Sequence, residues 1–314
     1  MTDILLTGGS GFLGEQLLKH PSFVNSHCVG RTRPKNSKNF NYIEITKLTN
    51  YGNILNNINC IVYVAGRAHV MNESAEDSLK KYREINTFSA LNLAKQASAH
   101  GVKRFIYISS IKVLGENTQK NSFMRFDDDP NPTDPYSVSK SEAEAGILSI
   151  CQESEMEFVI IRPPLIYGPG VKGNFELLLK LMSLPIPIPL GGLDNKRSLV
   201  SVGNVVDLIS ICLEHPKAKN QIFHVSDDRD MSTSELLKMI SKAKDRRSFL
   251  FKLPKSLIFI IFKLLKREGV YERLFSSMQI DINHTKSALD WEPSADIEGS
   301  IRECVLYLRD TKEK

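Results

Sequence analysis

The stretch 3-DILLTGGSGFLGEQLLKH-20 decides the fold of this 314-residue chain. An apolar run, 3-DILLTG-8, leads into a glycine-rich turn, and helix-forming residues follow at 12-FLGEQLLKH-20. The turn contains a GxxGxxG pattern (Gly8, Gly11, Gly14) and an overlapping GxGxxG pattern that starts at Gly9. Such glycines permit a tight turn and let backbone N–H groups approach a pyrophosphate. Because the turn lies between a first strand and a first helix, it predicts a dinucleotide-binding unit.

The rest of the first half repeats the alternation of strand and helix. Further strands are expected at 26-SHCVGR-31, 60-CIVYVAG-66, 104-RFIYISS-110 and 157-EFVIIRP-163, and helices at 79–100 and 136–151. Alternating β and α segments are typical of a parallel sheet with helices on both faces. The sequence therefore predicts an α/β fold, a Rossmann-type doubly wound parallel sheet with a smaller, loop-rich α/β substrate-binding domain.

The composition of the chain changes after Pro163. The segments 163-PPLIYGPGVKGN-174 and 184-LPIPIPLGG-192 are rich in Pro and Gly, which favour extended loops, and helical runs follow near 232–244 and 254–267. We expect residues 1–165 to form the dinucleotide-binding domain, joined by about 198–225. Residues 166–197 and 226–314 are expected to form the smaller domain.

Composition and charge argue against several classes of protein. A hydrophobic fraction of 41% and a charged fraction of 25% are those of an ordinary soluble globular protein. The 41 Lys and Arg exceed the 36 Asp and Glu, but the excess is spread along the chain, so we expect no nucleic-acid partner. Five widely separated cysteines include no CxxC pair, which argues against a disulfide framework and a zinc site. We expect no metal.

Two further features bear on location. The first residues, MTDILLTGG, lack the basic segment, long apolar core and cleavage site of a secretory signal, so we expect a cytoplasmic location. The most apolar run, 257-LIFIIFKLL-265, is far shorter than the roughly 20 residues that span a bilayer. We expect no integral membrane span and interpret the run as a buried or surface-packed helix. Contact with a membrane surface is the alternative, because basic residues flank the run.

The second expected strand bears on the choice of dinucleotide. A cofactor of the NAD type usually meets an Asp or Glu about 20 residues after the glycines. No Asp or Glu occurs between Glu15 and Glu44, and the strand ends in 28-CVGRTRP-34. The guanidinium groups of Arg31 and Arg33 suit a 2′-phosphate, so NADPH/NADP is favoured and NAD is the alternative.

Side chains capable of acid–base chemistry lie near the expected carboxyl edge of the sheet. Ser110 ends the strand 104–110, at the edge where open α/β sheets bind ligands. In 134-DPYSVSK-140, Tyr136 and Lys140 are four residues apart and share one helix face if Asp134 caps the helix. A neighbouring ammonium group lowers the pKa of a tyrosine from its usual value of about 10. The pattern predicts a proton donor and acceptor for a carbonyl or an alcohol.

Together with 162-RPPLIYGPG-170, these motifs resemble the extended short-chain dehydrogenase/reductase family over essentially the whole chain. The resemblance implies that Ser110 is the catalytic Ser/Thr and Tyr136 the acid/base. It implies that Lys140 depresses the pKa of the tyrosine and contacts the nicotinamide ribose, and that Asn86 is a supporting helix asparagine. The implied cofactor-binding residues are Gly8, Gly11, Phe12, Leu13, Gly14, Arg31, Arg33, Ala65 and Lys140.

The second half is similar to segments with which this family binds nucleotide sugars. In 197-RSLVSVGNVVD-207, Arg197 matches an arginine that binds the diphosphate, and Asp207 an aspartate that closes the strand-to-helix turn. Asn174 and Arg273 resemble further nucleotide-sugar contacts. The resemblance implies a UDP-sugar substrate bound by the smaller domain, and homodimers are common in the family.

Ile111 and Lys112 bear on the reaction. Sugar-nucleotide 4,6-dehydratases of this family carry an Asp-Glu pair directly after the catalytic Ser/Thr, because the removal of water needs an additional acid and base. This chain has Ile-Lys there, so dehydration is disfavoured. Redox chemistry at C4 of the sugar is left, either as epimerisation or as reduction of a 4-ketone.

Four segments, 66-GRAHVMNESAED-77, SSIKVLGE, RPPLIYGPGVKGNF and NKRSLV, resemble bacterial UDP-2-acetamido-2,6-dideoxy-hexulose 4-reductases. We therefore expect NADPH-dependent reduction of the C4 ketone of a UDP-4-keto-6-deoxy-N-acetylhexosamine to UDP-N-acetylquinovosamine, or its C4 epimer, for surface polysaccharides such as O-antigen. The first alternative is a UDP-hexose or UDP-N-acetylhexosamine 4-epimerase with tightly bound NAD. The second is a non-catalytic dinucleotide sensor.

Overall fold

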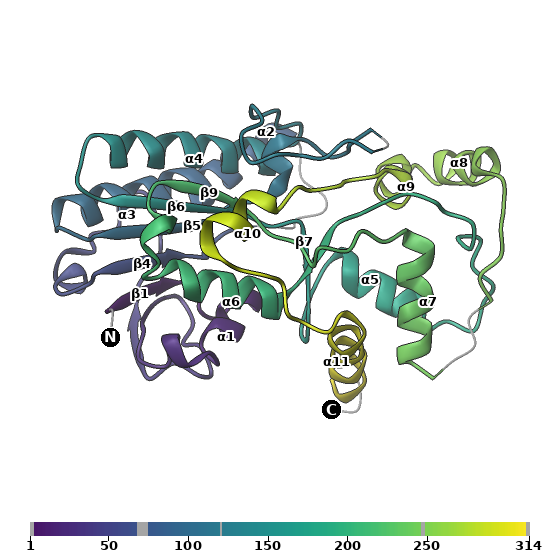
Figure 1. The fold of residues 1–314 in the computed structure, drawn as a ribbon, viewed down its shortest axis with the longest axis horizontal. Coiled ribbons are helices and arrows are strands. Elements are labelled where there is room, and N and C mark those ends of the chain that lie inside the picture. Colours follow the sequence, from purple (N-terminus) through teal and green to yellow (C-terminus); the bar gives the residue numbers. More distant parts are fainter. Residues whose placement is uncertain (1–2, 68–74, 120, 246–248, 312–314) are drawn as a thin grey trace.

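The computed structural model describes residues 3–67, 75–119, 121–245 and 249–311, and its largest element is a parallel sheet of seven strands (Figure 1). Residues 68–74, which include most of the 66–77 motif, lie outside the described residues. From edge to edge the strands run β3 (Asn39–Tyr42), β2 (His27–Gly30), β1 (Ile4–Thr7), β4 (Cys60–Tyr63), β5 (Arg104–Ile108), β6 (Glu157–Arg162) and β9 (Gln221–His224). This order confirms the predicted doubly wound α/β fold.

Helices cover both faces of this sheet (Figure 1). Successive residues of a buried strand point to opposite faces. Leu5 packs beneath α3 (Ser89–Ala99) and α4 (Pro135–Gln152). Leu6 packs in a second core, whose helices are α1 (Phe12–Leu17), α6 (Val202–Cys212) and α10 (Asn283–Leu289). Burial on both sides explains why the central strands are continuous apolar runs.

A third core builds the remaining lobe, on the side where the strands β4 to β6 end. It is formed mainly by Tyr167, Phe175, Leu199, Leu237 and Ile301 with their neighbours. The elements there are β7 (Leu165–Tyr167), β8 (Leu199–Ser201), α5 (Asn174–Leu181), α7 (Thr233–Ala243) and α11 (Ile297–Asp310). At its outer end lie α8 (Lys255–Leu264) and α9 (Glu268–Phe275) (Figure 1).

The predicted domain boundaries stay a prediction, and the packing bears on one of them, in the last part of the chain. Met278, Ile280 and Trp291 belong to the sheet core and not to the core of the smaller lobe. A boundary drawn by packing would therefore assign the segment 278–291 to the sheet, although it falls within the expected smaller domain 226–314.

One helix expected as a single run is interrupted. The run at 79–100 consists of α2 (Ala75–Tyr82), a π-helical turn (Arg83–Phe88) and α3. The helix expected near 254–267 is α8, which ends at Leu264, and α9 is a separate helix that begins at Glu268. A π-helical turn adds a residue to the helical repeat and is often found near functional sites.

Candidate active site

The glycine-rich turn after β1 leaves no room for side chains at two positions. Gly8 has a φ of +69°, and a Cβ there would lie 2.6 Å from the backbone nitrogen of Ala65. A Cβ on Gly14 would overlap the carbonyl oxygen of Gly8. The backbone of the turn is therefore held between β4 and α1, with Gly11 exposed as the N-cap of α1. This close approach fits a pyrophosphate bound by backbone N–H groups.

Thr7 holds the ends of β1 and β4 together, a role that the sequence reasoning missed. Its Oγ1 atom accepts hydrogen bonds from the backbone N–H groups of Val64 and Ala65, each at 3.1 Å. Thr7 is fully buried, so these bonds are shielded from water. The only sequence signal was a polar residue at the end of an apolar strand.

Phe12, Leu13 and Ala65 lie next to the glycine-rich turn, and their binding of a cofactor stays a prediction. The side chain of Leu13 is buried in the sheet core, and Phe12 packs against both that core and the core of the smaller lobe. Their side chains are thus used in packing, which leaves backbone groups as the parts that could meet a phosphate.

Arg31 and Arg33, which follow β2, were both expected to bind the 2′-phosphate of NADP, but their contacts differ. Arg31 and Arg33 are both exposed. Arg33 donates from Nη2 to the carbonyl oxygens of Ser37 at 3.4 Å and Lys38 at 3.2 Å. Because Arg33 ties down its own loop, Arg31 is the better placed of the two to meet a cofactor.

Ser110 and Tyr136 come together at the carboxyl end of β5. Ser110 caps a 3-10 turn (Ile111–Leu114), and its Oγ atom accepts a hydrogen bond from the N–H of Lys112 at 3.3 Å. Burial raises the pKa of Tyr136 to about 12, opposed by a hydrogen bond with the Ser110 side chain. The Ser110 and Tyr136 side chains therefore lie near each other, and their catalytic roles stay a prediction.

Lys140 lies one turn after Tyr136 on α4 and is almost completely buried. Its Nζ atom donates to the carbonyl oxygen of Ile108 at 2.8 Å and lies 4.5 Å from the centre of the Tyr107 ring. Burial lowers the pKa of Lys140 to about 7. The expected depression of the tyrosine pKa is not what the structure shows, because burial and the charge of Asp134 raise it instead.

Asn86 supports this arrangement from the π-helical turn. Its Oδ1 atom accepts from the N–H of Arg67 at 2.8 Å, and its Nδ2 atom donates to Ser139 Oγ at 3.0 Å. The next residue, Thr87, donates to the carbonyl oxygen of Ser139 at 2.7 Å. Two consecutive side chains thus hold the segment between Tyr136 and Lys140, as expected of a supporting residue.

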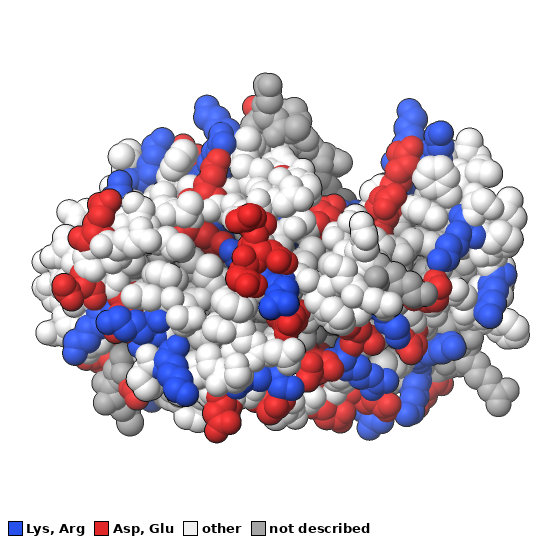
Figure 2. Space-filling view, turned by 45° about the horizontal axis from the view of Figure 1, so that its top comes forward, with Lys and Arg blue, Asp and Glu red and all other residues white. Residues whose placement is uncertain are grey.

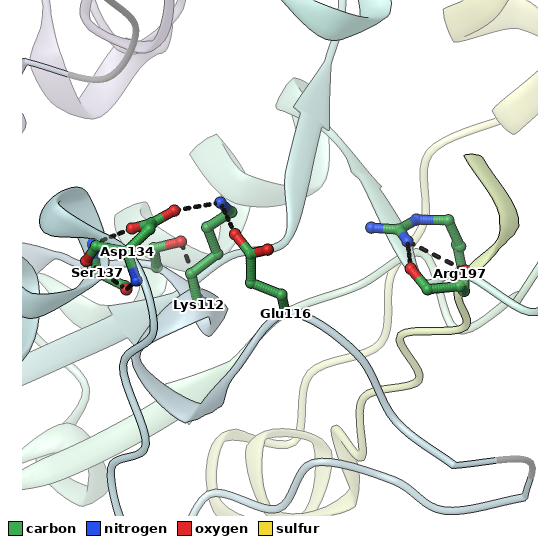
Figure 3. A network of polar contacts seen from close by, with 7 residues as sticks. Lys112, Glu116, Asp134, Ser137 and Arg197 are labelled. Atoms are coloured by element: carbon green, nitrogen blue, oxygen red, sulfur yellow. Dashed lines mark hydrogen bonds and ion pairs between the residues drawn. The ribbon is translucent and has the colours of Figure 1, made fainter. Parts of the chain in front are cut away.

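The start of α4 is fixed by a capping box and an ion triad (Figure 3). Asp134 accepts from the N–H of Ser137 at 2.6 Å through Oδ1, and its Oδ2 atom lies 2.6 Å from Lys112 Nζ. Lys112 also donates to Glu116 at 2.6 Å. The triad joins the Ser110 turn to the helix that carries Tyr136. Ile111, in contrast, is buried in the sheet core.

We expect Asp134→Ala to lower the free energy of unfolding by about 1–2 kcal/mol, because the helix loses its N-cap. Turnover should fall as well, since Tyr136 lies in the first turn of that helix. Asp134→Asn keeps an acceptor for Ser137 and should retain most of the stability. Urea unfolding and turnover of both variants test this; an Ala variant as stable as the wild type would contradict it.

Arg197 faces the triad from the smaller lobe (Figure 3). Its Nη1 atom donates to the carbonyl oxygen and Oγ of Ser276, at 3.1 and 3.0 Å. Burial lowers its pKa, as does the charge of Arg273, while Glu116 raises it. Two guanidinium groups close enough to repel each other suit an anionic ligand. Asn174 begins α5 and is half-buried, and no hydrogen bond among the described residues joins it to these arginines.

The expected role of Asp207 is wrong. Asp207 lies within α6, where its carboxylate accepts from Trp291 Nε1 at 2.7 Å. The turn from β8 into α6 is closed by Asp227, which accepts from the Ser201 N–H at 2.8 Å and from Asn204 Nδ2 at 2.7 Å. Asp227 comes from beyond β9, so a local pattern could not reveal it.

Comparison with known proteins agrees with this geometry. The sequence model of the NAD dependent epimerase/dehydratase family matches residues 4–226. The chain belongs to this family. This confirms the predicted family and shows that the chain is an enzyme. The predicted 4-reductase subgroup is not confirmed.

One relative and two solved structures illustrate the match. The chain is 41% identical to a UDP-glucose 4-epimerase of Vibrio cholerae over 307 residues, covering 96% of this chain and 93% of that protein. The structure of MoeE5 in complex with UDP-glucose and NAD has a TM-score of 0.78 and 20% identity, covering 99% of both chains. The UDP-glucose 4-epimerase of Thermotoga maritima with UDP-glucose has a TM-score of 0.77 and 21% identity, covering 99% of this chain and 100% of that one.

Proposed function

We propose that the chain is a UDP-sugar 4-epimerase that works with bound NAD. The observation that carries the proposal is the grouping of Ser110, at the carboxyl end of β5, with Tyr136 and Lys140 in the first turns of α4. The relative in Vibrio cholerae, a UDP-glucose 4-epimerase, supports epimerisation over the reduction that we first expected. The absence of an Asp-Glu pair after Ser110 disfavours dehydration.

In this proposal the protein moves one proton and orients one oxygen. Tyr136 takes the proton of the C4 hydroxyl as that carbon is oxidised, and returns it when the ketone is reduced from the opposite face. The Ser110 hydroxyl donates a hydrogen bond to the same oxygen, where negative charge develops. Arg197 and Arg273 hold the diphosphate, so that the 4-keto sugar can rotate and present its opposite face while the diphosphate stays bound.

The residues around the glycine-rich turn fit a dinucleotide. Backbone groups of Gly8, Gly11 and Gly14 would hold its pyrophosphate, and Lys140 its nicotinamide ribose. When bound, the nicotinamide supplies the acceptor and donor of hydride. Ser109 Oγ is buried without a hydrogen-bond partner among the described residues, and a polar group of the cofactor would supply that partner. We favour NAD because Arg33 is bonded within its own loop.

The second candidate is a 4-ketoreductase that uses NADPH. One observation favours it: the β2 end carries exposed Arg31 and no carboxylate follows before Glu44, so a 2′-phosphate would meet a positive charge. The pair of Ser110 and Tyr136 would then protonate the alkoxide formed from a 4-keto sugar. Synthesis of a surface polysaccharide precursor belongs to this candidate.

A two-armed assay separates the candidates. In the first arm, the purified enzyme receives UDP-glucose or UDP-N-acetylglucosamine without added cofactor. In the second, it receives NADPH and the 4-keto-6-deoxy product of a UDP-N-acetylglucosamine 4,6-dehydratase. The proposal expects the C4 epimer in the first arm, and NAD among the nucleotides released on denaturation. NADPH oxidation in the second arm, with no epimer in the first, would overturn it in favour of the reductase.

A further inference from the structure

The outward face of α8 carries an apolar stripe that the described fold leaves exposed. Its members recur at the spacing of one helical face, and they are Leu257, Ile260, Ile261, Leu264 and Leu265. All five are exposed, Leu264 by 78%. Ile258 is the buried residue of this helix, so the stripe points away from the protein. In an ordinary surface helix, such a stripe faces the core.

The inner face of α8 attaches the stripe to the substrate side of the molecule. Phe259 and Phe262 contact the ring of Tyr271 on α9, with centroids 5.2 and 6.1 Å away. Tyr271 stacks on Phe275 at 4.1 Å, and the next residue is Ser276, which holds Arg197. The stripe residues take no part in these ring contacts, because they lie on another face of α8 from Phe259 and Phe262.

The charges nearest the stripe are mostly basic. From Lys252 to Arg267 the sequence contains five Lys or Arg and no Asp or Glu; Glu268 follows, and Lys255 pairs with Asp194 at 2.8 Å. Lys263, Lys266 and Arg267 border the stripe and are exposed. Over the face shown in Figure 2, basic and acidic side chains are interspersed. A basic rim on an apolar stripe suits an anionic surface that has an apolar interior.

We propose that α8 docks the enzyme on the surface of an anionic phospholipid bilayer. The stripe enters the boundary between head groups and acyl chains, while the basic rim meets the lipid phosphates. Docking is peripheral, since no helix among the residues that the structure describes is long and apolar enough to cross a bilayer. A second copy of the chain is a poorer occupant, because a symmetric contact would bring two basic rims together.

Vesicle co-sedimentation tests the proposal with the full chain. Wild-type enzyme should sediment with vesicles of phosphatidylcholine and phosphatidylglycerol, and much less with phosphatidylcholine alone. The double variant Ile260→Glu/Leu264→Glu should lose about tenfold or more of the binding, since two charges enter the apolar stripe. Lys263→Gln/Lys266→Gln should weaken binding to the anionic vesicles only. Leu306→Glu is the matched control, because Leu306 is 42% exposed on α11, far from this stripe in sequence.

The outcomes are distinguishable from those of the proposed function. Circular dichroism and turnover on a water-soluble UDP-sugar should be unchanged in the α8 variants, so a loss of vesicle binding would not reflect unfolding. Wild-type enzyme that stays in the supernatant with anionic vesicles would overturn the proposal. So would a dimer that the double variant dissociates, since a second copy would then cover the stripe. The two proposals are tested independently: the enzyme can bind vesicles without epimerase activity, and it can be an epimerase that does not bind vesicles.

Discussion

Tyr136→Phe should lower kcat by about 10²- to 10⁴-fold, the range expected when a general acid or base is removed. The variant loses one oxygen atom while the ring keeps its contact with Tyr82, 5.8 Å away. Because the glycine-rich turn is untouched, the affinity for the dinucleotide should change little. Turnover and calorimetric titration of NAD measure the two effects separately.

The matched control is Tyr82→Phe, which removes the neighbouring hydroxyl. Tyr82 packs edge-on against Tyr136, but it belongs to α2 and not to the proposed set of Ser110, Tyr136 and Lys140. Its variant should keep kcat within a few-fold of the wild-type value. If Tyr136→Phe turned over like the wild type, the assignment of Tyr136 as the acid/base would be wrong, whichever sugar is the substrate.

Gly14→Ala should have the second largest effect. The new methyl group would clash with the Gly8 carbonyl oxygen and the Gly9 Cα atom, so α1 must move away from the turn. Overpacking of this kind typically costs about 1–3 kcal/mol of stability. The same movement pulls backbone N–H groups away from the pyrophosphate site, so binding of NAD should weaken at least in proportion. Urea unfolding and calorimetric titration measure the two effects.

Gly203→Ala provides the control for this prediction. A Cβ at Gly203, in the first turn of α6, meets only Ser201 Oγ at 3.9 Å. Alanine is also the better helix former, so the control should be as stable as the wild type or more stable. Equal NAD affinity in Gly14→Ala and Gly203→Ala would contradict the close-approach role of Gly14.

The sequence allowed prediction of the parts of the fold that depend on local patterns. Five strands, β1, β2, β4, β5 and β6, were expected and are confirmed. Each places residues in the cores on both faces of the sheet, and most of them are apolar runs. The helix that carries Tyr136 and Lys140 was expected at 136–151 and spans Pro135–Gln152. Its Asp and Pro at the start are local signals of a helix N-terminus.

The parts that sequence reasoning missed depend on contacts far apart in the chain. The edge strand β3 is mostly exposed and alternates Asn with aromatic residues, so it lacks an apolar run. β7 lies in a Pro-rich segment that predicted a loop, and pairs with β8 across more than 30 residues. Two hydrogen bonds likewise join distant segments: Arg197 donates to Ser276, and the Ser201 N–H at the β8–α6 turn donates to Asp227.

The triad of Lys112, Glu116 and Asp134 constrains how this enzyme could evolve into a dehydratase. Replacing Lys112 with an acid would place three carboxylates together, and like charges at such short range destabilise one another. An acid at Ile111 would bury a charge in the sheet core. Both substitutions are therefore unfavourable as long as Glu116, Asp134 and the apolar surroundings of Ile111 are unchanged, so an acid pair at these positions would require further changes around it.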